Sequence, residues 1–183
     1  MTGRGIQAIP NARGIRNIRI IGCGNPERGD DGAGLLVVQG LREPGIEAEE
    51  HSGEASSLME LWAGADAVIL IDAVSSGKPP GVITVLDASA GPIPISLPRS
   101  STHHWGVAEA VELARALHRL PARLLIYGIE GRCFELGSSP SLEVMKAMSK
   151  VVEEICAAMQ PTRKVRTPSP NSTQAFPRPA RSE

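Results

Sequence analysis

Short apolar runs alternate with stretches of helical periodicity through residues 17–159, and this alternation constrains the fold more than any other feature of the chain. Runs with strand character, most of them rich in Val, Ile and Leu, occupy residues 17–24, 46–51, 67–72, 82–87 and 124–128. Stretches with helical character occupy residues 31–42, 55–64, 103–120 and 141–159. Alternating strands and helices build a largely parallel sheet. We therefore predict an α/β fold: a three-layer, open, mostly parallel five-stranded sheet with helices on both faces, in which the run at 82–87, after a short Pro-Gly turn, is an antiparallel edge strand.

Composition divides the chain into one folded segment and two tails. Residues 160–183 contain five basic residues, one acidic residue and five of the 15 prolines, a composition typical of solvated chain. Residues 1–16 contain three arginines, no acid and no apolar run, which favours a disordered leader over a secretory signal. The expected organisation is a disordered leader at 1–16, a single α/β domain at 17–159 and a disordered, basic, Pro-rich tail at 160–183.

Charge and cysteine content argue against several classes of function. The whole chain has a formal net charge of −1, and because the tail contributes +4 and the leader +3, the segment 17–159 carries −8. An acidic domain does not attract nucleic acid or an anionic membrane, and the apolar runs are far shorter than the ~20 residues of a membrane helix. Three cysteines without a CxxC pair favour a reducing compartment. We expect a soluble, cytoplasmic protein, and the absence of a heptad pattern favours a monomer.

A glycine-rich loop with two adjacent acids, at residues 22–34, follows the first expected strand and precedes the first expected helix. Ligands of open α/β sheets bind beyond the carboxyl ends of the strands, so a site is expected here. The loop is not a dinucleotide fingerprint, because Glu27 replaces the third glycine and the two carboxylates would repel a pyrophosphate. Asp30 and Asp31 could both act as helix caps, because a carboxylate at a helix N-terminus accepts hydrogen bonds from free backbone amides and complements the helix dipole. In tandem, one can cap the helix while the other points into the crevice, and we assign the second role to Asp31.

Two further residues are expected at the same edge of the sheet. Asp72 ends an apolar run, where a carboxylate either faces the crevice or caps the following turn through Ser75 or Ser76. His103 begins a helix after a Pro-rich loop. Two carboxylates and an imidazole suit a divalent ion such as zinc, nickel or cobalt, and they could equally orient a water molecule without metal.

Other candidate residues have weaker support from their surroundings. His51 ends the second expected strand on the same face, and its role stays open, as does that of His104. Cys23 lies at an apolar strand end, which favours a small buried hydrophobic residue over a nucleophile. Ser57 lacks the G-x-S-x-G elbow, so a serine triad is unsupported.

In their order along the chain, these motifs resemble those of the maturation endopeptidases of nickel-iron hydrogenases. The resemblance covers about residues 17–159 and is carried by Gly22-x-Gly24-Asn25, Asp30-Asp31-Gly32-x-Gly34, Asp72-Ala-Val, Pro80-Gly81, Thr102-His103 and Gly128-Ile-Glu130. The combination is specific, whereas no single motif is. Two departures bear on substrate choice: family members often carry a Gly-Gly-Thr-like stretch where this chain reads His51-Ser-Gly53-Glu54, and the basic tail is not part of the pattern.

The resemblance implies both a site and a function. The family's metal-binding positions are Asp31, Asp72 and His103 in this chain. The implied activity is that of an aspartic-type endopeptidase with Asp31 and Asp72 as catalytic residues, and Asp31 is the favoured general base. The implied partner is the hydrogenase large-subunit precursor, whose C-terminal extension is removed once nickel has been inserted. Nickel then arrives with the substrate, and partial coordination by the enzyme leaves positions open for it.

Two other classes of function stay open. A non-catalytic, metal-dependent chaperone of the same precursor would keep the ligands without cleaving. The opening residues 22–26 also resemble those of bacterial peptidyl-tRNA hydrolases, but that family continues into an Arg-His-Asn segment, whereas this chain reads Arg28-Gly29-Asp30-Asp31. The negative charge of segment 17–159 also opposes tRNA binding.

Overall fold

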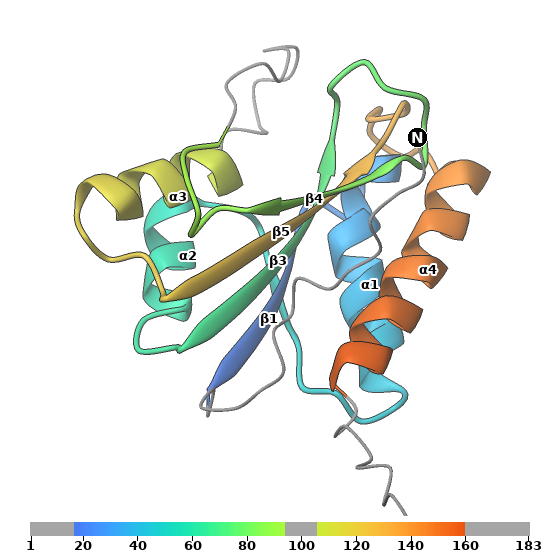
Figure 1. Ribbon diagram of the computed structural model, residues 1–183. Coiled ribbons are helices and arrows are strands. Elements are labelled where there is room, and N and C mark those ends of the chain that lie inside the picture. Colours follow the sequence, from blue (N-terminus) through green and yellow to red (C-terminus); the bar gives the residue numbers. More distant parts are fainter. Residues whose placement is uncertain (1–16, 94–105, 160–183) are drawn as a thin grey trace, which may run out of the picture.

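The computed structural model describes residues 17–93 and 106–159, which form one five-stranded sheet covered by helices on both faces (Figure 1). The strands are β1 (Ile18–Cys23), β2 (Glu49–His51), β3 (Ala67–Val74), β4 (Ile83–Asp87) and β5 (Arg123–Glu130). The helices are α1 (Ala33–Arg42), α2 (Ala55–Leu61), α3 (Gly106–Ala116) and α4 (Leu142–Met159), and a short 3-10 helix, η1 (Gly29–Gly32), precedes α1. The predicted leader and tail lie outside the described residues.

The strand order is β2-β1-β3-β5-β4. Strands β2, β1, β3 and β5 run parallel, whereas β4 pairs antiparallel with β5 at the edge. This arrangement confirms the predicted α/β fold and its antiparallel edge strand. Because the parallel strands share one direction, their carboxyl ends meet at the upper end of the sheet in Figure 1, where the first turns of α1 and α4 also lie.

The sheet is buried on both faces, which explains the nearly continuous apolar sequence of its central strands. On β3, Val68 and Leu70 belong to the cluster beneath α2 and α3, while Ile69 and Ile71 belong to the cluster beneath α1 and α4. Successive side chains of a strand point to opposite faces. Both helical layers are therefore needed to remove this strand from water.

Some boundaries differ from those predicted. Strand β3 continues two residues past Asp72, because β5 also continues and supplies partners: Asp72 pairs with Gly128 and Val74 with Glu130. A charged residue therefore does not end the strand when its backbone can stay in the ladder. Strand β2 is only Glu49–His51, shorter than the predicted 46–51. Helix α3 is described from Gly106, and residues 94–105, which include His103, lie outside the described part.

Two glycines allow α1 to begin directly against the sheet. A Cβ atom on Gly34 would lie 2.4 Å from the carbonyl oxygens of both Cys23 and Ile71, and one on Gly22 would lie 2.1 Å from the carbonyl oxygen of Gly34. Neither approach is possible for a residue with a side chain. This contact places the acidic loop, which leads into α1, at the ends of β1 and β3.

Candidate active site

The acidic loop lies across the end of β1. The Gly24 amide donates a hydrogen bond to the His51 carbonyl oxygen at 3.1 Å, which ties the start of the loop to β2. Gly24 has φ +138°, and a Cβ there would lie 1.9 Å from the Asp31 carbonyl oxygen. Asp31 is 5% exposed. The loop therefore turns back on itself and holds Asp31 directly beside the end of β1.

Asp72 reaches the same end of the sheet from β3. It alternates with Val68 and Leu70 along the strand, so its side chain belongs to the face covered by α2 and α3. Burial, and secondarily the charge of Asp72, raise the pKa of the Cys23 thiol well above its ordinary value. Gly22 pairs with Ile71 between the two strands, so the next residue of β3, Asp72, comes beside Cys23, the last residue of β1. The two predicted acidic residues therefore lie at the same end of the sheet.

The third predicted residue, His103, lies outside the described residues. Helix α3 begins three residues later, and its Val107 and Val111 pack in the same cluster as Leu70 of β3. Within residues 17–93 and 106–159, no group of three or more His, Cys, Asp or Glu side chains could hold a metal ion. Of the three predicted ligands, the described residues therefore include Asp31 and Asp72.

Asp30 has a structural role that the sequence did not predict. Its side chain is fully buried, and its carboxylate accepts hydrogen bonds from the amides of Arg132 (2.8 Å), Cys133 (2.9 Å) and Ser141 (2.6 Å) and from the Ser141 hydroxyl (3.1 Å). Burial alone would raise the pKa of Asp30, but these bonds lower it below the ordinary value. The expected helix cap is not formed by this residue, because α1 has Gly32 at its N-cap and no side-chain cap.

Glu130 is a second buried carboxylate that binds backbone amides. It is 2% exposed and accepts from the amides of Ser76 (2.6 Å), Gly77 (2.8 Å) and Lys78 (3.2 Å), and also from the Ser76 hydroxyl (2.6 Å). The turn after β3, for which Asp72 was one predicted cap, is therefore capped by Glu130. The signal in the sequence was the same as for Asp72: an acid near the end of an apolar strand.

His51 lies in a small hydrogen-bonded chain at the start of α2. Its Nδ1 accepts from the Gly53 amide at 2.9 Å, so the neutral ring carries its proton on Nε2 and donates to the Ser57 hydroxyl at 3.1 Å. That hydroxyl donates to Glu54 at 2.6 Å. A histidine that donates to a serine cannot take its proton, so this pair is not a catalytic dyad. His51 instead holds the loop after β2.

We predict a pH-dependent loss of stability that depends on His51. Burial lowers the pKa of His51, against an opposing effect of Glu54, so the folded state favours the neutral ring. The unfolded chain binds this proton more readily, so the free energy of unfolding falls as pH drops below about 6.5. The expected loss reaches about 1 kcal/mol, because protonation of Nδ1 breaks one hydrogen bond. Urea unfolding at pH 7.5 and 5.5 measures it, and a His51→Gln variant with the same pH dependence as the wild type would contradict the assignment.

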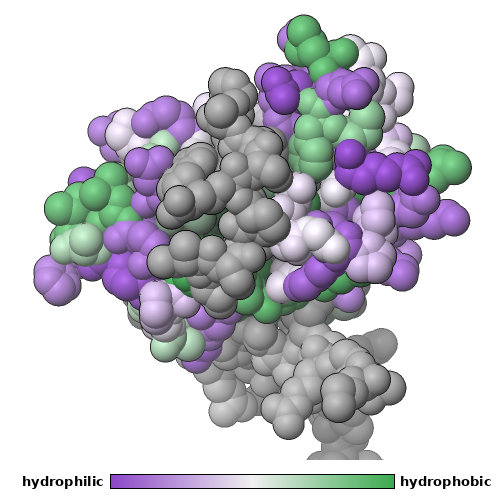
Figure 2. All heavy atoms as spheres, turned by 90° about the horizontal axis from the view of Figure 1, so that it is seen from above, coloured by the Kyte–Doolittle hydropathy of each residue, from purple (hydrophilic) through white to green (hydrophobic). Residues whose placement is uncertain are grey.

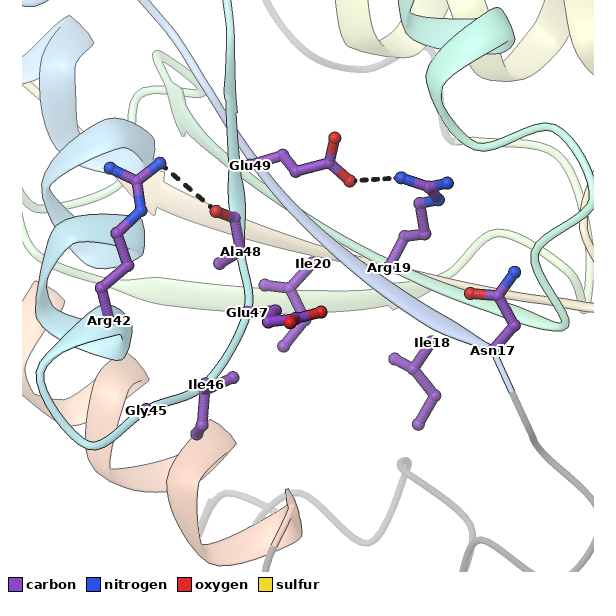
Figure 3. Close-up of a pocket in the computed structure, with 10 residues that line it drawn as sticks. All are labelled: Asn17, Ile18, Arg19, Ile20, Arg42, Gly45, Ile46, Glu47, Ala48 and Glu49. Carbon is purple, nitrogen blue, oxygen red and sulfur yellow. Dashed lines mark hydrogen bonds and ion pairs between the residues drawn. The ribbon is translucent and has the colours of Figure 1, made fainter.

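A cavity of about 640 Å³ lies at the other end of the sheet, beside the start of β1 (Figure 3). It exists because β2 pairs only with the last three residues of β1. Its arginines are engaged by carboxylates: Arg19 binds Glu49 at 2.6 Å and Arg42 binds Glu50 at 2.8 Å. The cavity lies at the opposite end of the sheet from Asp31 and Asp72. Figure 2 views the molecule from above, and hydrophilic and hydrophobic residues are mixed across its coloured surface.

Fold and site together define an α/β domain with two acidic residues, Asp31 and Asp72, at the carboxyl end of its parallel sheet. The family described as HycI, hydrogenase maturation protease, matches residues 53–158. A protein of Methanocaldococcus jannaschii named as a hydrogenase maturation protease is 30% identical over 152 residues, which cover 76% of this chain and 94% of the relative. The chain belongs to the hydrogenase maturation protease family. Among the described residues, no helix has the length and apolar character that crossing a membrane requires.

Other relatives agree with this assignment. The hydrogenase expression/formation protein HupM of Azotobacter chroococcum is 29% identical over 119 residues, which cover 62% of this chain and 57% of HupM. The chain thus spans little more than half the length of this curated relative. The solved structure of the [NiFe] hydrogenase maturation protease HybD from Thermococcus kodakarensis is 27% identical, with a TM-score of 0.63, and the match covers 79% of this chain and all of HybD.

Proposed function

We propose that this protein is an endopeptidase that removes the C-terminal extension of the nickel-loaded hydrogenase large-subunit precursor. The observation that supports the proposal is that Asp31 and Asp72 both lie at the carboxyl end of the sheet, within the fold of this protease family. The acidic loop and strand β3, which are far apart in the sequence, supply these residues, and both lie where parallel α/β sheets bind their ligands.

In the proposed mechanism, nickel belongs to the substrate. Asp31, Asp72 and His103 supply oxygen and nitrogen donors, and this partial set leaves positions open for a nickel ion already held by the precursor. Asp31 acts as general base: it takes a proton from the water that attacks the scissile carbonyl. On this basis the enzyme is of the aspartic type. The requirement for the metal restricts cleavage to precursors into which nickel has already been inserted.

Cysteine chemistry is not part of the proposal. The pKa of Cys23 is raised by burial and by Asp72, so at neutral pH this residue is a thiol and not a thiolate nucleophile. Cys23, Cys133 and Cys156 are all free. Free thiols favour a reducing compartment, which supports the proposed cytoplasmic location.

Mass spectrometry of the large-subunit precursor tests the proposal directly. The precursor is incubated with this protein before and after nickel loading, and we expect loss of the C-terminal extension only from the loaded form. Cleavage of both forms would contradict the role of nickel. An intact precursor that still binds this protein would contradict the protease and favour the non-catalytic chaperone.

A further inference from the structure

Asp30 joins two loops that are far apart in the sequence. Its carboxylate binds the amides of Arg132, Cys133 and Ser141, and its own amide donates to the Cys133 carbonyl oxygen at 2.8 Å. The same two loops meet again where the Gly137 amide donates to the Glu27 carbonyl oxygen at 2.7 Å. The acidic loop is therefore bound along its length to the segment that links β5 to α4.

The packing between these loops leaves little room for adjustment. A Cβ atom on Gly131 would lie 2.9 Å from the Cβ of Asp30, and one on Gly29 would lie 2.7 Å from the Cys133 carbonyl oxygen. Gly29 also has φ +56°, a conformation that favours glycine. The backbone around Asp30 is thus held by contacts as well as by hydrogen bonds.

The segment bound by Asp30 is also connected to Asp72. The Gly131 amide donates to the Val74 carbonyl oxygen at 2.9 Å, two residues after Asp72 on β3. On the other side of Gly131, Glu130 binds the turn that follows β3. Residues 130–133 therefore contact both the loop that carries Asp31 and the strand that carries Asp72.

We propose that Asp30 is a positioning residue that sets the place of Asp31 relative to Asp72 and takes no part in the chemistry itself. The inference rests on the proposed function, which assigns Asp31 and Asp72 to the site. Asp30 immediately precedes Asp31, and both its carboxylate and its backbone amide are bound to the segment after β5, so a shift of the Asp30 backbone also moves the backbone of Asp31. Because catalytic groups lose effectiveness when displaced by about 1 Å, this anchoring affects the rate more than the binding of substrate.

An Asp30→Asn variant tests the proposal, because the amide side chain has the same shape but only one acceptor oxygen. In either orientation its NH₂ group faces at least one backbone amide that Asp30 now accepts from, so the loop has to move. We expect kcat for cleavage of the nickel-loaded precursor to fall by about 30-fold to 100-fold, with KM changed less than about threefold. Backbone amide exchange should show faster exchange at Arg132, Cys133 and Ser141 relative to amides of β3.

A matched variant separates positioning from loss of stability. Val151→Ala creates a cavity beneath α4 in the core, where Val151 is fully buried, and lowers the melting temperature without touching the loops. At a temperature below the melting temperatures of Val151→Ala and Asp30→Asn, the Val151→Ala variant should retain wild-type kcat. Wild-type kcat in Asp30→Asn, or an equal loss in Val151→Ala, would overturn the inference. An inactive wild-type protein would instead overturn the proposed function.

If Asp30→Asn does not fold, Ser141→Ala provides a milder test. It removes only the hydroxyl bond to Asp30 and keeps the amide bond. A kcat reduced by about threefold to fivefold at unchanged KM supports positioning by Asp30, and wild-type kcat overturns it.

Discussion

Replacement of Asp31 by asparagine should lower the rate of precursor cleavage by about a thousandfold. The amide keeps the shape of the carboxylate but cannot take a proton from water, and general base catalysis contributes about 10²-fold to 10⁴-fold. Single-turnover kinetics with the nickel-loaded precursor measures the effect. Asparagine has nearly the same shape as aspartate, and a circular dichroism spectrum of the variant checks that it folds.

Glu27→Gln is the matched control for Asp31→Asn. Glu27 is an exposed acid of the same loop, and the bond it accepts from Gly137 involves its backbone carbonyl, which the substitution leaves in place. We expect wild-type cleavage from this variant. Normal cleavage by Asp31→Asn would contradict base catalysis by Asp31 and leave metal polarisation of the carbonyl as the explanation to test.

Replacement of Gly34 by alanine should destabilise the protein by at least about 3 kcal/mol. The new methyl group would lie 2.4 Å from two backbone carbonyl oxygens and 2.7 Å from the Cys23 amide nitrogen. Backbone atoms in the sheet cannot rotate away, so α1 would have to move off the strands. Intrinsic helix propensity points the other way, since alanine is favoured over glycine by about 1 kcal/mol. Urea unfolding at neutral pH measures the balance.

Gly91→Ala provides the comparison for this change. Gly91 lies in the described part of the loop after β4, and a Cβ there would meet no heavy atom within 4 Å. The free energy of unfolding of the Gly91→Ala variant should stay within about 0.5 kcal/mol of the wild-type value. If Gly34→Ala were equally neutral, the close approach of α1 to the sheet would not hold the acidic loop in place.

Part of the candidate site could be predicted from the amino-acid sequence. The positions of Asp31 and Asp72 at one end of the sheet could be predicted, because glycine punctuation and apolar periodicity locate strand ends. The division of roles between the two adjacent acids was only partly predictable. Helix capping was the expected local role, yet Asp30 binds amides 102, 103 and 111 residues further along the chain. A local sequence pattern does not identify hydrogen-bond partners that lie so far along the chain.

The amino-acid sequence by itself determined the class of fold, the order of its strands and helices along the chain, and the edge position of β4. These properties follow from periodicity and turn residues, which act over a few neighbouring positions. Only the tertiary structure decided what the buried carboxylates Asp30 and Glu130 do. A buried carboxylate takes its role from the donors that surround it, and here those donors are backbone amides brought near by packing of the sheet.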